Sequence, residues 1–279
     1  MSGFFWLASY PKSGNTWVRL ALWSLKNGGA PIDFSDRLDF GHIATSRPGF
    51  ERALGIESSD LSREEIANLR PSSYETRAEA ATTPLFCKVH DGCDRTPAGV
   101  PLFPPETTLG VIHIVRDPRD VALSFAHHTG WTVDRTIAFM AKPYWSQPPQ
   151  QSWLDDHLPF LLPDWSSHAE SWLGAPGRQP PLLVRYEDLL TDPLAGLDRM
   201  ARYIGWPSDE ALLERTVAAT RFQTLREAEQ RQGFIERTRR ADRFFRRGEA
   251  GSWRGSLSEA QARRIETDHA TLMVRLGYR

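Results

Sequence analysis

Cysteine, lysine and long apolar runs are scarce in this chain of 279 residues. The two cysteines, Cys87 and Cys93, are too few for a disulfide scaffold. No apolar run approaches the roughly 20 residues that a helix needs to cross a membrane. The first residues have neither the basic region nor the cleavage site of a signal peptide. These absences exclude membrane-spanning and disulfide-stapled proteins, and they lead us to expect a cytoplasmic protein.

An excess of charge of one sign is also absent. The sequence has 34 Lys and Arg residues against 35 Asp and Glu, which gives a formal net charge of −1, so any surface that binds polyanions must be local. Hydrophobic residues make up 40% and charged residues 25% of the chain, a balance typical of folded soluble proteins. No long linker separates two domains, and we predict a single domain over residues 1–279.

Segments typical of strands and of helices alternate along the chain. Short runs that are apolar along their length predict strands at residues 4–8, 85–90, 111–115 and 182–186. Helical periodicity and capping residues predict helices at residues 15–25, after Asp117-Pro118, after Asp192-Pro193 and after the capping box Ser258-x-x-Gln261. This alternation indicates the α/β class, with a central parallel sheet flanked by helices. Residues 31–83 are polar and predict irregular structure with one short helix from Ser62.

Four polar residues stand at or just after the ends of these strands: Lys12, His90, Arg116 and Tyr186. Ligands of parallel α/β sheets bind beside the carboxyl ends of the strands. We therefore expect the four side chains to converge on one crevice, which would be the functional site.

The segment between the first strand and the first helix, Tyr10-Pro11-Lys12-Ser13-Gly14-Asn15-Thr16-Trp17, has the composition of an anion-binding loop. Backbone N–H groups in such a loop lie at the positive end of the helix dipole and suit a phosphate or sulfate group. Lys12 adds a positive charge, and Ser13 and Thr16 add hydroxyl groups. The loop is not a Walker A sequence, because its lysine precedes the glycine. An ordinary turn with a surface lysine is the alternative interpretation.

Two later segments carry further positive charge. Arg116 follows the third predicted strand and Ser124 lies in the second turn of the next helix, where both suit a second anionic group; a structural role for each is the alternative. Residues 236–254 hold seven arginines and three acids, a local charge of +4. Basic residues beside two glycines suit a phosphate held by side chains and backbone together. A solvated basic surface and an RNA-binding tail are the alternatives for this segment.

Together and in this order, the three segments resemble the sulfotransferases that use 3'-phosphoadenosine 5'-phosphosulfate (PAPS) and release adenosine 3',5'-bisphosphate (PAP). The resemblance runs from about residue 4 to residue 255 and implies a P-loop-like phosphosulfate-binding loop at residues 10–17. It implies that Arg116 and Ser124 bind the 3'-phosphate and that the loop from Arg246 to Trp253 closes over it. The dimer-forming segment of the family's cytosolic members is not found after Trp253, so we expect a monomer or a homodimer.

The resemblance also implies roles for single residues. His90, in Lys88-Val89-His90, would be the general base, and Lys12, Lys88 and Ser124 would assist the transfer. The residues implied to bind PAPS are Lys12, Ser13, Gly14, Asn15, Thr16, Trp17, Arg116, Ser124, Tyr186, Thr220, Phe222, Leu225, Phe244, Arg246, Arg247 and Gly248. Trp17 and Phe222 would stack on the adenine. No metal is implied, and a zinc site at Cys87 and His90 is disfavoured because these side chains point to opposite faces of a strand.

We therefore predict a sulfotransferase that moves the sulfuryl group of PAPS to a hydroxyl or phenol group of a small molecule. Aromatic residues and prolines are frequent in residues 131–172, which we expect to form a lid or wall of the acceptor site, with His90, Tyr144 and Trp145 touching the acceptor. We expect neither nucleic acid nor membrane as a partner. The alternatives are a carbohydrate sulfotransferase, a P-loop-type nucleotide kinase or NTPase, and a non-catalytic RNA-binding protein.

Overall fold

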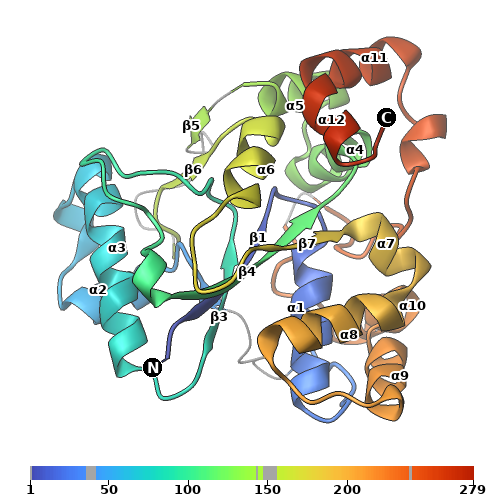
Figure 1. Cartoon of the computed structure of the whole chain (residues 1–279). Helices are drawn as coiled ribbons and strands as arrows, with labels where there is room; N and C mark the ends of the chain where they lie inside the picture. Colours follow the sequence, from blue (N-terminus) through green and yellow to red (C-terminus); the bar gives the residue numbers. More distant parts are fainter. Residues whose placement is uncertain (1, 36–41, 143, 147–155, 239–240) are drawn as a thin grey trace. The chain divides into compact units, whose positions relative to one another are not determined.

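The computed structural model describes residues 2–35, 42–142, 144–146, 156–238 and 241–279. The chain forms two compact units, whose elements are labelled in Figure 1. The first unit consists of Met1–Tyr10, Gly41–His113 and Lys142–Leu183, and the second of Pro11–Phe40, Ile114–Ala141 and Val184–Arg279. Both units draw on segments that are far apart in the sequence, and the single domain over residues 1–279 stays a prediction.

Within the described residues, one sheet has the strand order β2-β3-β1-β4-β7, and β5 and β6 pair antiparallel in a second sheet. The strands are β1 (Phe4–Ser9), β2 (His42–Ile43), β3 (Leu85–Val89), β4 (Thr108–Val115), β5 (Tyr144–Ser146), β6 (Phe160–Leu162) and β7 (Leu182–Arg185). β1 and β3 pair in parallel, with Phe4 opposite Leu85, and β2 also runs parallel to β3. The four predicted strands and the parallel sheet are thus confirmed.

Helices occupy most of the remaining described chain. The α-helices are α1 (Asn15–Lys26), α2 (Arg47–Leu54), α3 (Arg63–Ala80), α4 (Pro118–Thr129), α5 (Val133–Met140), α6 (Trp165–Leu173), α7 (Tyr186–Thr191), α8 (Pro193–Ile204), α9 (Glu210–Ala219), α10 (Phe222–Gln232), α11 (Glu259–Asp268) and α12 (Ala270–Arg275). Short 3-10 helices lie at η1 (Ser58–Asp60), η2 (Pro105–Thr107) and η3 (Ser252–Gly255). With the parallel sheet, these helices confirm the predicted α/β class.

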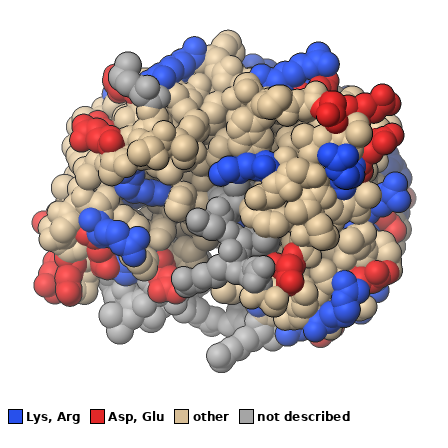
Figure 2. All heavy atoms as spheres, turned by 90° about the horizontal axis from the view of Figure 1, so that it is seen from below, with Lys and Arg blue, Asp and Glu red and all other residues tan. Residues whose placement is uncertain are grey.

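Charged side chains of both signs are mixed on the surface. On the face shown in Figure 2, Lys and Arg side chains lie among Asp and Glu side chains instead of forming one broad basic patch. This arrangement agrees with the net charge of −1 for the whole chain, and it requires that any attraction for an anion on this face come from a local group of side chains. Among the described residues, no helix is both long enough and apolar enough to span a membrane.

The helices of the second unit begin where their capping residues predict. The Asp117 carboxylate accepts a hydrogen bond from the Arg119 N–H (2.9 Å) at the start of α4, and Asp192 accepts one from Ala195 (3.0 Å) at the start of α8. Ser258 forms the predicted capping box at the start of α11. These side chains satisfy backbone N–H groups that the first helical turn leaves unpaired, so the predicted helix starts are confirmed.

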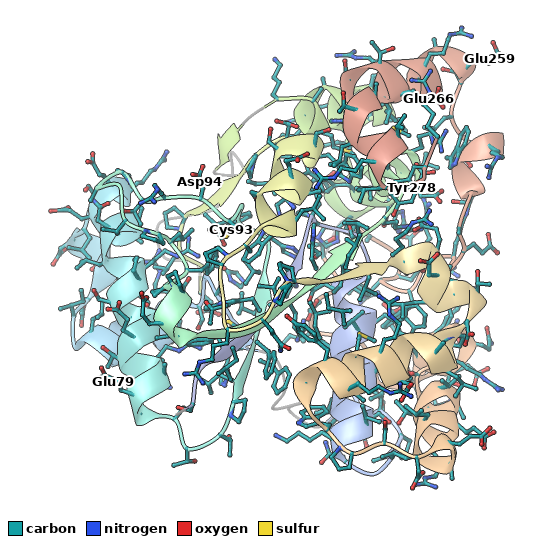
Figure 3. All side chains as sticks on the ribbon, in the orientation of Figure 1. Glu79, Cys93, Asp94, Glu259, Glu266 and Tyr278 are labelled. Carbon is teal, nitrogen blue, oxygen red and sulfur yellow. The ribbon has the colours of Figure 1, made fainter. Side chains whose placement is uncertain are left out.

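Arg119 links α4 to the C-terminal helices of the second unit. Its guanidinium donates to Asp117 (2.7 Å), to Glu266 on α11 (2.6 Å) and to the Tyr278 carbonyl (2.8 Å); Figure 3 labels Glu266 and Tyr278. Ile265 on α11, Leu272 on α12 and Leu276 directly after α12 are buried. The network therefore fixes the C-terminal helices to the helix that directly follows Arg116.

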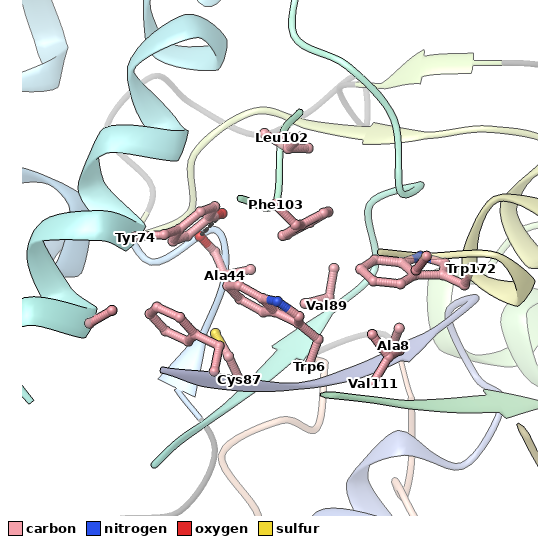
Figure 4. Close-up of a cluster of buried hydrophobic side chains, with 13 residues drawn as sticks. Trp6, Ala8, Ala44, Tyr74, Cys87, Val89, Leu102, Phe103, Val111 and Trp172 are labelled. Atoms are coloured by element: carbon pink, nitrogen blue, oxygen red, sulfur yellow. Dashed lines mark hydrogen bonds between the residues drawn. The ribbon is translucent and has the colours of Figure 1, made fainter. Parts of the chain in front are cut away.

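The first unit has an aromatic core around β1, shown in Figure 4. Phe4 and Trp6 stack at 4.4 Å between ring centroids, and the Trp6 indole N–H donates to the Thr108 hydroxyl at 2.9 Å. Cys87 is fully buried in the same cluster. A thiol in this apolar environment contributes packing, and within the described ranges no group of three or more His, Cys, Asp or Glu residues is arranged to hold a metal ion.

The predicted irregular structure of residues 31–83 is wrong for much of that region. It contains β2 and α2, and α3 spans 18 residues after a capping box formed by Ser62 and Glu65. Pro71 lies inside α3. Proline removes a backbone donor and normally ends a helix, so the sequence pattern favours a helix much shorter than the one that tertiary packing stabilises.

Candidate functional site

The loop between β1 and α1 has the backbone of an anion-binding turn. Lys12 adopts a left-handed conformation with φ of 70°, and Gly14, the N-cap of α1, has φ of 102° and no side chain to cap the helix. The Ser13 hydroxyl is buried and has no hydrogen-bond partner among the described residues. Buried hydroxyl groups are normally paired. A phosphate or sulfate oxygen would satisfy Ser13 and the N–H groups at the start of α1 together.

Tyr186 packs directly on this loop. A Cβ atom at position 14 would lie 2.6 Å from Cδ2 of Tyr186, so only glycine permits this approach as well as the positive φ. The Tyr186 ring also meets the Trp17 ring edge-on, with centroids 5.8 Å apart. The Arg116 guanidinium carbon lies 4.3 Å from the centroid of the same tyrosine ring. Three of the predicted donor-binding residues, Trp17, Arg116 and Tyr186, are therefore in contact around Gly14.

Arg116 holds together segments that are distant in the sequence. Its guanidinium donates to the Lys12 carbonyl (3.3 Å) and to the Glu249 carbonyl (3.0 Å). Burial and the positive charges of Arg247 and Arg116 lower the pKa of Arg246. The like charges around Arg246 repel its guanidinium, and an anion bound among these side chains would relieve the repulsion. The three arginines predicted to surround a phosphate are therefore brought together.

A mostly apolar cavity of about 160 Å³ lies beside the loop within the second unit. It is lined by Trp17, Val18, Ala21, Leu189, Leu190, Pro193, Leu197, Met200, Val217, Thr220, Arg221 and Phe222. The Trp17 indole N–H donates to the Thr220 carbonyl at 2.9 Å, which fixes the orientation of the indole ring. Aromatic rings beside an apolar cavity suit a flat heterocycle.

Several of the remaining predicted donor-binding residues of the second unit pack beside this cavity or the loop. Gly248, with φ of 66°, packs so closely on the Phe222 ring that any Cβ atom would overlap it. Leu225 is buried in a cluster against which Trp17 and Phe222 pack, and it is not among the residues that line the cavity. The Lys12 ammonium lies 4.3 Å from the centroid of the Phe244 ring. Ser124 is half-buried on α4.

Three acidic residues of this site carry no sequence signal. The Glu236 carboxylate accepts from the Thr16 hydroxyl (2.9 Å) and from Arg19 (2.6 Å). Glu229 accepts from the backbone N–H of Phe244 (2.6 Å) and of the residue after it (2.9 Å). Asp120 on α4 binds the segment that begins at residue 251. The contacts span 220 residues for Glu236 with Thr16, 131 for Asp120 with Gly251 and 15 for Glu229 with Phe244, so no local motif identifies these acids.

His90 belongs to the first unit, directly after β3. Its Nδ1 lies 2.8 Å from the Ser9 carbonyl oxygen. A carbonyl can only accept, so Nδ1 carries the hydrogen and Nε2 is the basic nitrogen. Side chains alternate along an extended strand, which places Lys88 on the same face as His90. The role of His90 as general base stays a prediction, and this tautomer is compatible with it.

Two buried histidines of the first unit were not predicted to matter. His113 on β4 and His168 on α6 are both fully buried, with ring centroids 6.4 Å apart. Burial lowers the pKa of His113 to about 3, and burial together with the nearby His113 and His90 lowers the pKa of His168. Tyr10 meets the His168 ring edge-on at 5.6 Å. Both histidines are therefore neutral near pH 7.

The predicted acceptor region is described only in part. Tyr144 and Trp145 belong to β5, and their side chains lie outside the described residues. Trp165 and Trp172 are both buried on α6. Residues seven positions apart lie on the same face of a helix, and here that face is turned toward the core. A lid or wall at residues 131–172 stays a prediction.

The chain resembles known proteins along almost its whole length. The model of the sulfotransferase domain matches residues 4–277. Sulfotransferase 1C2 of Oryctolagus cuniculus is 22% identical over 271 residues, which cover 93% of this chain and 79% of that protein.

Two solved structures share the fold. The structure of mouse sulfotransferase SULT7A1 complexed with PAP has a TM-score of 0.63 at 17% identity and covers 98% of this chain and 85% of that one. The structure of retinol dehydratase in complex with androsterone and inactive cofactor PAP has a TM-score of 0.60 at 21% identity. It covers 97% of this chain and 80% of that one. With the family model matching almost the whole chain, the protein belongs to the sulfotransferase family.

Proposed function

We propose that the second unit binds PAPS and that the protein transfers its sulfuryl group to a hydroxyl or phenol group of a small molecule. The observation that carries this proposal is the cluster of Arg116, Arg246 and Arg247, in which burial and like charges lower the pKa of Arg246. Such a cluster is suited to a phosphate dianion. A ligand with two anionic groups accounts for both this cluster and the anion-binding loop at Ser13.

The other parts of PAPS have matching groups in the same unit. The phosphosulfate suits the loop with its buried Ser13 hydroxyl, where Lys12 supplies a positive charge. The adenine suits the cavity lined by Trp17 and Phe222, and base stacking of this kind contributes about 1–3 kcal/mol. Mouse SULT7A1 and retinol dehydratase, both solved with PAP, share this fold and support the choice of ligand.

His90 is proposed as the general base of the transfer. Its Nε2 accepts the proton of the acceptor hydroxyl while the acceptor oxygen forms a bond to sulfur. The bond between sulfur and the oxygen of the 5'-phosphate breaks, and Lys12 stabilises the negative charge that develops on that leaving oxygen. Lys88 assists at the sulfuryl oxygens, and Ser124 binds the 3'-phosphate. Positioning and charge stabilisation are the main requirements of such a transfer, by analogy with phosphoryl transfer.

The proposed acceptor is a small molecule with a hydroxyl or phenol group. Retinol dehydratase has been solved with androsterone, and its likeness to this chain supports a small-molecule acceptor. We propose Tyr144 and Trp145 on β5 as part of the acceptor-binding wall.

Calorimetric titration with PAP, ADP and ATP tests the donor assignment. We expect PAP to bind at least about tenfold more tightly than either of the others, because only PAP carries the 3'-phosphate. Sulfur-labelled PAPS offered with a panel of phenols and alcohols then tests the transfer, with heat-inactivated protein as control. Preference for ATP, or no binding of PAP, would contradict the proposed function.

A further inference from the structure

We propose that Asp120 is the positioning residue for the 3'-phosphate half of the donor site, because it holds the loop that carries Arg246 and Arg247. The inference rests on the proposed function, since the loop matters in this way only for a donor with a 3'-phosphate. Asp120 lies in the first turn of α4 and is 1% exposed. A carboxylate this deeply buried needs strong hydrogen bonds to compensate for its lost hydration.

The carboxylate of Asp120 receives its hydrogen bonds from one short segment. Oδ2 accepts from the Gly251 N–H at 2.6 Å, and Oδ1 accepts from the Ser252 hydroxyl at 2.9 Å and from the Trp253 N–H at 3.0 Å. Gly251 is the N-cap of η3 and has no side chain with which to cap it. Asp120 therefore caps η3 from another helix, with charge-assisted bonds that are stronger than neutral ones.

The hydrogen bonds to Asp120 fix one end of the loop from Arg246 to Trp253, and other contacts fix the middle of this loop. Arg116 donates to the Glu249 carbonyl at 3.0 Å, and Gly248 packs on the Phe222 ring. Asp120 stands four residues after Arg116 in the sequence. The connection between β4 and α4 therefore carries Arg116, and the first turn of α4 carries the carboxylate that anchors the loop bearing the other two arginines. A loop anchored in this way loses less freedom when the ligand binds.

The negative charge of Asp120 also stabilises the arginine cluster. Arg247 and Arg116 lower the pKa of Arg246, whereas Asp120 acts in the opposite direction. Replacement by asparagine would keep the size of the side chain but remove this charge. It would also turn an NH2 group toward donors that now bind a carboxylate oxygen. Asp120→Asn thus affects the positions of the arginines and their charge balance together.

The test compares the affinities for PAP and AMP, which differ by the 3'-phosphate. Glu266→Gln is the matched control, because it also removes a carboxylate bonded to a side chain of α4 but leaves the bonds to residues 251–253 in place. We expect Asp120→Asn to lower the ratio of PAP to AMP affinity about tenfold or more, with little change in AMP affinity. Glu266→Gln should keep the wild-type ratio even if its melting temperature falls.

A wild-type ratio in folded Asp120→Asn would overturn the inference. If that variant does not fold, Ser252→Ala removes one of the three donors, and we expect it to lower the ratio about threefold; an unchanged ratio in Ser252→Ala would then overturn the inference. A wild-type protein that does not distinguish PAP from AMP would contradict the proposed function, which is a separate failure.

Discussion

The two compact units place basic side chains in different environments. The second unit gathers the guanidiniums of Arg116, Arg246 and Arg247, whose repulsion favours a bound anion. The first unit buries His113 and His168, which burial keeps neutral. The comparison teaches that the proposed donor site brings like charges together, whereas the first unit keeps these two histidines neutral and pairs its buried Arg70 with Asp91. His90 of the first unit is only partly buried and has a defined tautomer, which suits it to proton transfer.

The largest expected effect is that of His90→Gln. A positioned general base contributes about 10²- to 10⁴-fold to a rate, so we expect sulfuryl transfer to fall within that range. The affinity for PAP should stay within about twofold, because none of the residues proposed to bind PAPS belongs to the unit that contains His90. Rates and PAP titrations of the variant measure both, with His127→Gln as control. Nearly full transfer activity in His90→Gln would show that another group takes the proton.

Arg246→Gln tests whether the arginine cluster of the second unit binds the 3'-phosphate. Loss of one charged hydrogen-bond donor costs about 1.5–3 kcal/mol, so PAP affinity should fall about 10- to 100-fold, while AMP affinity changes little. Titration of both ligands measures the difference, and Arg243→Gln, at an exposed arginine nearby, is the control. An equal loss for PAP and AMP would place Arg246 away from the 3'-phosphate.

Phe222→Ala tests the contribution of the apolar cavity to adenine binding, whereas the arginine variant tests the charged groups. We expect about 1–3 kcal/mol weaker binding, and the loss should be equal for PAP and AMP because both carry adenine. Phe222→Leu is the control that keeps an apolar side chain against Gly248. A loss that appears for PAP alone would mean that Phe222 acts through the loop and not through the base.

The stability of the first unit should depend on pH through His113. Its pKa is about 3 in the folded chain and near the ordinary value of about 6.5 when unfolded, so the unfolded state binds more protons between these values. Stability is therefore complete above pH 6.5 and falls as the pH decreases, by up to about 1.4 kcal/mol per pH unit down to pH 3. Urea unfolding of wild type and His113→Leu at several pH values measures the slope. The same slope in both proteins would contradict the burial argument.

The smallest expected effect is that of Glu236→Gln. The carboxylate accepts from Thr16, a residue of the anion-binding loop, so removing its negative charge should tighten PAP binding by a few-fold, or at most about 1 kcal/mol. Calorimetry of this variant against Glu227→Gln, at an exposed position, isolates the effect. Weaker binding would show that Glu236 orders the loop more than it repels the ligand.

Features of the fold and the candidate site that depend on short runs of consecutive residues could be predicted from the sequence. The loop at Lys12 and Ser13, the arginine after β4 and the tyrosine after β7 each follow an apolar strand, and strand ends in a parallel sheet lie at a common edge. Helix starts were equally accessible, because a cap acts within its own first turn. These signals are local, so they can be recognised without any knowledge of the tertiary structure.

The remaining features depend on contacts between distant residues. Asp120 and Gly251 are 131 residues apart, and Thr16 and Glu236 are 220 residues apart, so no spacing rule joins them. The continuation of α3 through Pro71 depends on tertiary packing that outweighs the local cost of proline. The neutrality of His113 depends on complete burial, which a single histidine in an apolar strand does not reveal by itself.

The central claim is that the second unit binds one nucleotide with two separate anionic groups. A crystal structure of the protein with PAP tests it most directly. The account predicts the 3'-phosphate among Arg116, Arg246 and Arg247, the 5'-phosphate at the Ser13 loop, and the adenine beside Trp17 and Phe222. A nucleotide bound elsewhere, or one whose 3'-phosphate touches none of these arginines, would contradict the account.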